Sequence, residues 1–408
     1  MTAALAAAAL VALLCALSTF QLSRAVSRRL PEDQGGDATA RTAARILLGP
    51  YSGFLSGWTL VCGLLLSSAV LALAFGAYVV PSHPVAGAVG AVIAMGAVNL
   101  LGINRGAWAT RFILAFVLGV LAFSVVVLWN EAPHQPIRVG AEIDPSVSGT
   151  LQAAGLLFFL FSGYTKLATL GKGVRNPSRN LPLAIPAAIA AAFVLYLLMG
   201  ESMLAYYGPA ALAAEPAPLL APMESVGANV GTGAIIIAAA AASLGGMWGL
   251  LESAGRTAAA MAADRDLPSL FGRTRMSRGG GGDAAGMEDN GIDGGTVQGT
   301  GTPWAAEAAG VLAVIVLVLL GDLDGLIGMA SFALLFYAAI TTMCAFSLKD
   351  RTKYAPRALN VAGTAGALLL ALALPPLAIS LTLIILVAGL VVRLSFRRPR
   401  STRAQPTL

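Results

Sequence analysis

Charged residues are scarce in this chain of 408 residues, since Asp, Glu, Lys and Arg together make up only 11% of it. Soluble domains carry roughly 25% charged residues, so this chain lacks the polar material to cover several soluble globules. Hydrophobic residues account for 57% of the sequence, and the mean hydropathy is +0.79. The composition therefore indicates an integral membrane protein embedded in a lipid bilayer.

Histidine and cysteine are also rare. The two histidines, His83 and His134, are too few ligands for a His-rich metal site and leave little material for a haem. The three cysteines, Cys15, Cys62 and Cys344, each lie inside an apolar run, which argues against a disulfide framework and a zinc knuckle. We therefore expect no cofactor.

Eleven apolar runs are interpreted as membrane-spanning helices, because a helix needs about 20 mostly apolar residues to cross a hydrocarbon core about 30 Å thick. Prolines divide two longer stretches, at 81–84 and at Pro375-Pro376, which we read as helical hairpins. The expected spans are 3–22, 54–79, 85–103, 112–129, 150–170, 183–206, 231–256, 305–320, 325–348, 358–374 and 377–392. The predicted fold class is thus an all-α polytopic membrane helix bundle of about eleven transmembrane helices, in one domain over 1–408.

The basic residues follow these spans regularly. Nearly all of the 26 Lys and Arg residues fall in alternate loops and in the C-terminal tail, and the exceptions are Arg138 and Lys166. Cytoplasmic loops of membrane proteins are enriched in Lys and Arg. We therefore expect a multi-pass protein of the cell membrane with a cytoplasmic C-terminus. The net charge of +6 is attributed to this topology rather than to nucleic-acid binding.

Two segments outside the spans have distinctive compositions. Residues 272–302 are rich in glycine and lack apolar anchors, which predicts a flexible cytoplasmic loop. A phosphate-binding loop is disfavoured because these glycines are not followed by Gly-Lys-Ser/Thr. Residues 393–408 are predicted to form a basic cytoplasmic tail.

The span at 150–170 carries the strongest functional signal. Ser162-Gly163 interrupts its helix-forming pattern, and Lys166 is the basic residue at membrane depth. A helix broken within the bilayer frees backbone N–H and C=O groups that a polar solute can bind. A close helix crossing is the alternative, since small residues are common at such contacts.

Two acidic residues near the ends of expected spans have structural interpretations. Glu252 precedes Arg256 by four residues on one expected helix, which is the spacing of an ion pair. Glu307 lies in the first turn of its expected helix, where a carboxylate suits the helix dipole.

Three motifs, in order along the chain, resemble those of amino acid–polyamine–organocation (APC) permeases. The segment FFLFSGYTKLATLGKGVRNPSRNLPLAI, residues 158–185, is similar to the sixth helix of that family and the loop after it. Residues 254–268, AGRTAAAMAADRDLP, resemble the segment after the eighth helix. Residues 30–58, which begin LPEDQGG and end LGPYSGFLSGW, resemble the region between the second and third helices. Together the motifs extend the resemblance over essentially the whole chain.

This resemblance implies a leucine-transporter-like fold and secondary-active transport of amino acids by alternating access, without enzymatic chemistry. The short form of the chain resembles exporters of apolar amino acids. The residues around the helix break are expected to bind the substrate, and they are Phe161, Ser162, Gly163, Tyr164 and Thr165. Phe159 and Lys166 are candidates for gating or coupling, with a proton or a sodium ion as the coupling partner.

Departures from the family pattern leave an alternative open. The span at 3–22 aligns with the second helix of the family, so the first helix is expected to be missing. Thr165 stands where an acidic residue is usual, and Lys172-Gly173 replace an acidic pair. The alternative is a truncated, non-transporting permease homologue or a membrane sensor. A membrane-embedded enzyme is disfavoured, because no cluster of Asp, Glu or His lies near one membrane face.

Overall fold

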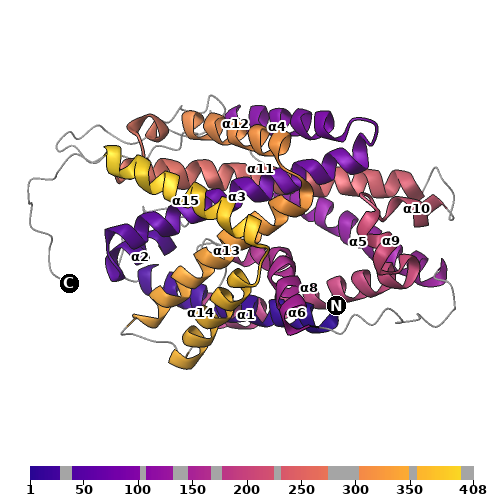
Figure 1. Ribbon diagram of the computed structural model, residues 1–408, viewed down its shortest axis with the longest axis horizontal. Coiled ribbons are helices and arrows are strands. Elements are labelled where there is room, and N and C mark those ends of the chain that lie inside the picture. Colours follow the sequence, from indigo (N-terminus) through magenta and orange to yellow (C-terminus); the bar gives the residue numbers. More distant parts are fainter. Residues whose placement is uncertain are drawn as a thin grey trace, which may run out of the picture.

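The computed structural model describes residues 1–27, 39–101, 107–131, 146–166, 177–224, 231–273, 303–348 and 356–396. These residues form helices joined by turns and contain no strand (Figure 1). Eight helices are long and apolar enough to cross a membrane, and three further apolar helices are shorter. The eight include α1 (Thr2–Ser27), α3 (Pro50–Val79), α5 (Ala107–Glu131), α6 (Val147–Leu157) with η2 (Phe158–Lys166), α8 (Pro177–Tyr207), α11 (Gly231–Ala263), α13 (Leu323–Phe346) and α15 (Pro376–Phe396).

The three shorter apolar helices are α4 (Pro84–Leu100), α12 (Trp304–Leu320) and α14 (Arg357–Leu372). Each of the eleven expected spans therefore corresponds to one helical segment, which confirms the predicted fold class of an all-α polytopic bundle. Proline begins α4 and α15 at the turns where the two hairpins were predicted. Its fixed φ suits the first turn of a helix, and its missing N–H leaves no intrahelical bond unmade there.

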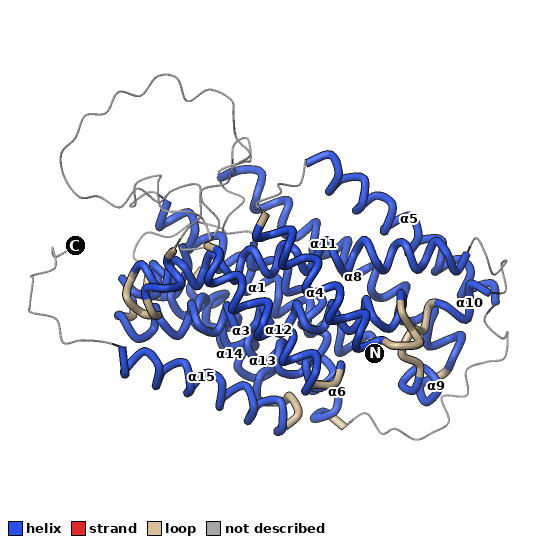
Figure 2. The backbone as a smooth tube through the Cα atoms, turned by 90° about the horizontal axis from the view of Figure 1, so that it is seen from above, coloured by secondary structure: helices blue, strands red, loops and turns tan. Residues whose placement is uncertain are grey.

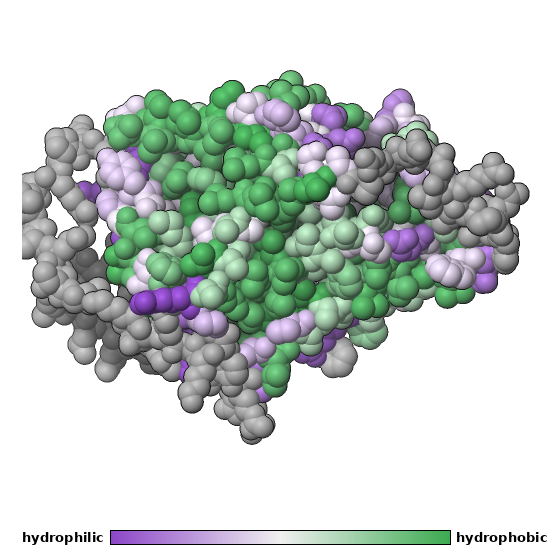
Figure 3. Space-filling model, turned by 60° about the horizontal axis from the view of Figure 1, so that its bottom comes forward, coloured by the Kyte–Doolittle hydropathy of each residue, from purple (hydrophilic) through white to green (hydrophobic). Residues whose placement is uncertain are grey.

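Helices α3 and α13 lie in the centre of the bundle (Figure 1). In their most apolar stretches 67% and 78% of the residues are buried, against 22% in α5 and 11% in α8. Helices α5 and α15 run along opposite margins in the view of Figure 2. A broad hydrophobic surface covers the middle of the face in Figure 3, and hydrophilic residues gather mainly toward its ends. This distribution is expected of a bundle whose outer helices contact lipid.

Some short helices were not predicted. They are α2 (Thr39–Leu47), α9 (Pro209–Ala214), α10 (Leu220–Glu224) and η3 (Ser269–Gly272). Helix α8 also begins earlier than expected, and it contains Pro182 and Pro186. The glycine-rich loop expected at 272–302 lies outside the described residues from 274 onward, and so does the tail from 397 onward.

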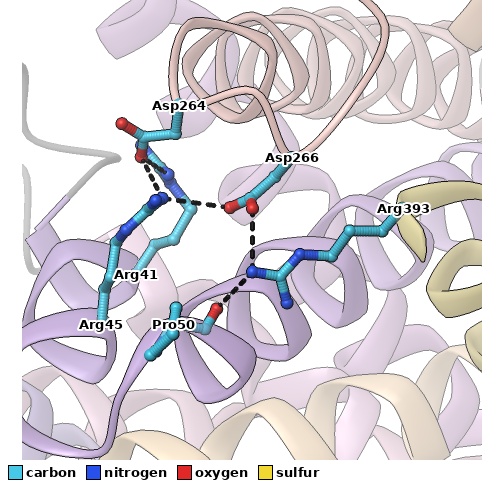
Figure 4. A network of polar contacts seen from close by, with 6 residues as sticks. All are labelled: Arg41, Arg45, Pro50, Asp264, Asp266 and Arg393. Atoms are coloured by element: carbon cyan, nitrogen blue, oxygen red, sulfur yellow. Dashed lines mark hydrogen bonds and ion pairs between the residues drawn. The ribbon is translucent and has the colours of Figure 1, made fainter. Parts of the chain in front are cut away.

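Five charged residues connect α2, the turn after α11, and α15, and we call them the charged brace: Arg41, Arg45, Asp264, Asp266 and Arg393 (Figure 4). Arg41 and Arg45 of α2 both form ion pairs with Asp264. Nη1 of Arg45 also lies 3.2 Å from Oδ2 of Asp266. The brace therefore places two basic residues of α2 against two acidic residues that follow α11.

Arg393 completes the brace from α15. Its Nη2 lies 3.0 Å from Oδ1 of Asp266 and donates a hydrogen bond of 2.7 Å to the carbonyl of Pro50. Its guanidinium also lies over the rings of Tyr51 and Phe54, at 4.9 and 4.7 Å from their centroids. Helix α15 continues through Arg393 to Phe396, although the tail was expected to begin at residue 393. The guanidinium can be buried at this point of the helix because it has a carboxylate partner.

Replacement of Arg393 by methionine tests the charged brace. The side chains of Arg393 and Asp266 are both fully buried, so Arg393→Met leaves a buried carboxylate with one guanidinium fewer. We expect the free energy of unfolding to fall by about 3–5 kcal/mol. Arg357→Met, at the exposed start of α14, is the matched control and should unfold like the wild type. The measurement is unfolding of the purified protein in detergent, and equal stability of the two variants would contradict the role of the brace.

Candidate functional site

The candidate site is built on η2, where the backbone changes from one helix type to another. Helix α6 ends at Leu157, and the chain continues as a 3₁₀-helix from Phe158 to Lys166. The sequence placed the interruption at Ser162-Gly163, whereas the change of geometry begins earlier, at Phe158. A 3₁₀-helix has poorer hydrogen-bond geometry than an α-helix, and runs longer than 3–4 residues are uncommon. The nine residues of η2 are therefore an unusually long stretch of weakly bonded backbone.

One face of η2 is buried in the bundle. Residues three apart are eclipsed in a 3₁₀-helix, and here Phe158, Phe161 and Tyr164 are all buried. Edge-to-face ring contacts join Phe158 to Tyr164 and Phe161 to Tyr196 of α8, with centroids 6.1 and 5.5 Å apart. Two predicted substrate-binding residues, Phe161 and Tyr164, thus have side chains that anchor the segment in the core.

The other two faces of η2 are more accessible. Leu160 and Gly163 are exposed, while Phe159, Ser162 and Thr165 are half-buried. Of the predicted substrate-binding residues, Ser162, Gly163 and Thr165 are therefore the ones that are not buried. Lys166 is the last residue of η2, and its side chain lies outside the described part of the chain.

Carbonyl groups of this segment accept hydrogen bonds from side chains. The hydroxyl of Tyr196 donates to the carbonyl of Leu160 at 3.2 Å, and Thr165 Oγ1 donates to the carbonyl of Ser162 at 3.0 Å. Ser331 Oγ of α13 donates to the carbonyl of Leu156 at 3.4 Å, just before η2 begins. Oxygen atoms along this part of the backbone are therefore available to hydrogen-bond donors outside the helix ladder.

Gly163 lies beside open space. A Cβ atom added there would meet no atom within 4 Å, apart from its own helix and chain neighbours. The close-crossing alternative applies instead to Gly155 of the same span, where an added Cβ would lie 2.8 Å from the carbonyl oxygen of Leu370 on α14. Gly155 in α6 therefore allows close packing against α14, whereas Gly163 in η2 has open space beside it.

The buried face of η2 also holds one polar atom without a partner. The Tyr164 side chain is 5% exposed, and its hydroxyl makes no hydrogen bond within the described residues. It lies within electrostatic range of Cys15 on α1 and Tyr337 on α13. A buried hydroxyl without a partner costs about 1–3 kcal/mol, so Tyr164 provides a donor and acceptor that a polar guest could satisfy.

The surroundings of η2 carry few charges. Helices α1 and α13 contact η2, and Tyr196 reaches it from α8. The described side chains with formal charge on these helices lie toward the helix ends, at Arg24, Glu201 and Asp324. The site is therefore composed of backbone carbonyls, hydroxyl groups and aromatic rings. Such a site can hold a small solute that offers N–H donors and an apolar body.

Sequence reasoning missed Tyr196 and Ser331 as partners of this segment. Each lies within an apolar run on a different helix, and no spacing in the sequence relates it to residues 156–160. The available signal was the polar side chain itself, because hydroxyl groups at membrane depth can bond to a neighbouring helix.

Comparison with known proteins identifies similar chains. Residues 1–403 match the amino acid permease family. An uncharacterized transporter of Mycobacterium tuberculosis is 35% identical over 407 residues, which cover 99% of this chain and 86% of that protein. A methylthioribose transporter of Bacillus subtilis is 24% identical over 56% of this chain and 47% of its own length. The chloroplastic cationic amino acid transporter 7 of Arabidopsis thaliana is 22% identical over 39% of this chain and 32% of its own length.

Removal of the Tyr196 hydroxyl tests whether η2 depends on donors from other helices. Tyr196→Phe keeps the ring contact with Phe161 but leaves the carbonyl of Leu160 without this donor. We expect a loss of about 0.5–1.5 kcal/mol in stability. Backbone amides of η2 should also exchange hydrogen faster in mass-spectrometric exchange measurements. Tyr206→Phe near the end of α8 is the control, and unchanged exchange in both variants would contradict this role for Tyr196.

Proposed function

This chain belongs to the amino acid permease family, and on that premise we propose that it carries a small zwitterionic amino acid across the membrane by alternating access at η2. Membership of this family makes the protein a multi-pass membrane transporter of the APC superfamily rather than an enzyme. The family match and the helical bundle agree with the expectations drawn from the motifs. The identity of the substrate, the direction of transport and the coupling ion go beyond family membership and are proposals.

The observation that carries the proposal is the open space beside Gly163 on a long 3₁₀ segment. Ammonium groups are strong hydrogen-bond donors, and backbone carbonyls freed from a helix ladder are suitable acceptors for them. Ser162 and Thr165 add hydroxyl groups on the half-buried face. We therefore assign the substrate ammonium to the backbone around Phe161, Ser162 and Gly163.

The charge pattern supports a neutral substrate side chain. Among the described residues, the buried carboxylates are Asp266 and Glu307, and neither belongs to η2 or to α1, α6 or α13, which contact it most. A substrate with a cationic side chain would thus find no carboxylate partner at η2 from these helices. Some similar plant proteins are nevertheless named for cationic amino acids. We propose an apolar amino acid as substrate and export as the direction, in a cell membrane with the C-terminus in the cytoplasm.

Phe159 is positioned to act as a gate in this mechanism. It packs against two hydrophobic clusters, one built mainly from α1, α6, η2, α13 and α14, the other mainly from α3, α4, α11, α12 and α13. Alternating access requires one group of helices to move against another around a fixed site. A ring shared by both clusters would shift when they move relative to each other, which supports a gating role.

Substitution of Gly163 by leucine tests the site. The added side chain would fill the open space without displacing a neighbour at its Cβ, so the protein should fold and insert normally. We expect counterflow of labelled apolar amino acids in proteoliposomes to fall at least about tenfold, equivalent to about 1.4 kcal/mol in free energy. Gly90→Leu on α4, where an added Cβ also meets nothing within 4 Å, is the matched control and should keep wild-type flux.

Two other outcomes would contradict the proposal. Wild-type flux in the Gly163→Leu variant would exclude η2 as the substrate site. If wild-type protein exchanges no amino acid from a complete panel in either orientation, the alternative of a non-transporting homologue or sensor would be favoured.

A further inference from the structure

Glu307 is a buried acidic side chain that the proposed transport site does not use. It lies in the first turn of α12, as the sequence predicted, and its side chain is 3% exposed. Its Oε2 makes no hydrogen bond within the described residues. An ionised carboxylate is costly in such a place unless it is paired, so the neutral, protonated form is favoured there.

The close approach of α11 accounts for the burial of this carboxyl group. A Cβ atom added at Gly255 of α11 would lie only 2.7 Å from Cγ of Glu307. The absence of a side chain at Gly255 therefore lets Glu307 lie against the backbone of α11. Any larger residue at position 255 would push the carboxyl group out of this position.

Two charged residues of α11 face Glu307. Arg256 forms an ion pair with Glu252 four residues earlier, which confirms the pairing predicted from their spacing. Both residues act electrostatically on Glu307, Glu252 by repulsion and Arg256 by attraction. The one guanidinium is paired with Glu252, so two carboxyl groups lie near a single positive charge, and the group of three is neutral only when one carboxyl holds a proton. The proton belongs on Glu307, because the Glu252 side chain is 35% exposed.

The other elements packed against α12 bring no further formal charge. Helices α3 and α4 and the short helix η3 contain no Asp, Glu, Lys, Arg or His. Among the described elements, Glu252 and Arg256 are therefore the charged groups that face Glu307. The Arg256 side chain is 61% exposed, so the group of three reaches water at this end of the bundle.

A continuous hydrophobic cluster connects this region to η2. The cluster contains Met247 and Leu251 of α11 and Val314 and Val318 of α12, and Phe159 of η2 packs against it. A change in how α11 and α12 pack around Glu307 can therefore reach the proposed gate through touching side chains.

We propose that Glu307 is the proton-binding site through which transport is coupled to a proton gradient. In each cycle the carboxyl group exchanges one proton with water at the Arg256 end of α11 when the transporter is open to that side and with water on the opposite side when it is open there, so one proton crosses the membrane and no other bond changes. This inference rests on the proposed function for its coupling role, whereas proton binding by Glu307 can be tested without transport.

The first experiment measures proton binding alone. Infrared spectra of the purified wild-type protein at neutral pH should contain a carbonyl band of a buried protonated carboxyl group. Glu307→Gln should lack this band, and Glu201→Gln, which alters a carboxyl on α8, should keep it. A band of equal intensity in the wild type and Glu307→Gln would overturn the assignment, whether or not the protein transports amino acids.

The second experiment separates exchange from gradient-driven transport in proteoliposomes. Glu307→Gln should retain amino acid counterflow within about twofold at equal pH on both sides, because exchange requires no net proton movement. The same variant should lose accumulation driven by a pH gradient, and Glu307→Asp should recover part of it. Undiminished gradient-driven accumulation by Glu307→Gln would overturn the coupling role. Absence of counterflow in the wild type would instead count against the proposed function.

The third experiment uses the two neighbours of Glu307 to shift its titration in opposite directions. Glu252→Gln removes a repulsive charge, so Glu307 should hold its proton less tightly and the pH of half-maximal transport should fall. Arg256→Gln removes an attractive charge, so this pH should rise. A shift in the same direction in both variants, or no shift in either, would exclude Glu307 as the titrating group.

Discussion

The requirement that backbone polar groups find partners inside the hydrocarbon core determines most of this fold. Within a bilayer an unpaired N–H or C=O costs several kcal/mol, so spanning segments become helices that satisfy their own bonds. The chain follows this rule in its long central helices, α3 and α13. Segment η2 departs from it, and hydroxyl groups of Tyr196 and Thr165 bind the carbonyls of Leu160 and Ser162. Irregular backbone of this kind is tolerated where protein or a watery cavity surrounds it.

Burial of a charged side chain is costly, and this protein accommodates its buried acidic residues in two different ways. In the charged brace, Asp266 lies close to both Arg45 and Arg393, so this buried carboxylate has two cationic partners. Glu307 has no such arrangement, because the nearby Arg256 is already paired with Glu252. Loss of one partner from such a buried ion pair is strongly destabilising, so the brace favours one arrangement of these helices. A buried carboxyl group whose nearby counter-charge is already paired can gain or lose a proton more easily, which suits a coupling role.

Motifs and local pattern predicted the parts of this protein that depend on neighbours in the chain. The hydrophobic runs predicted the spans, the prolines predicted the two hairpin turns, and the four-residue spacing predicted the pair of Glu252 and Arg256. The helix interruption was predicted at Ser162-Gly163, inside η2, whereas the change to 3₁₀ geometry begins at Phe158, since small residues mark weak helix positions but not where the bonding pattern changes. The brace was missed altogether, because its members come from residues 41–45, 264–266 and 393.

The sequence by itself determined that this chain is a bundle of membrane helices of the permease type, because apolar length, proline position and motif order are local properties. Only the tertiary structure decided that Gly155 permits a close helix contact while Gly163 leaves open space. The tertiary structure also decided that the Arg393 guanidinium lies beside a buried carboxylate, whereas Oε2 of Glu307 has no hydrogen-bond partner within the described residues. These outcomes depend on which distant helices pack against each residue, and that packing results from burial over the whole chain rather than from any one segment.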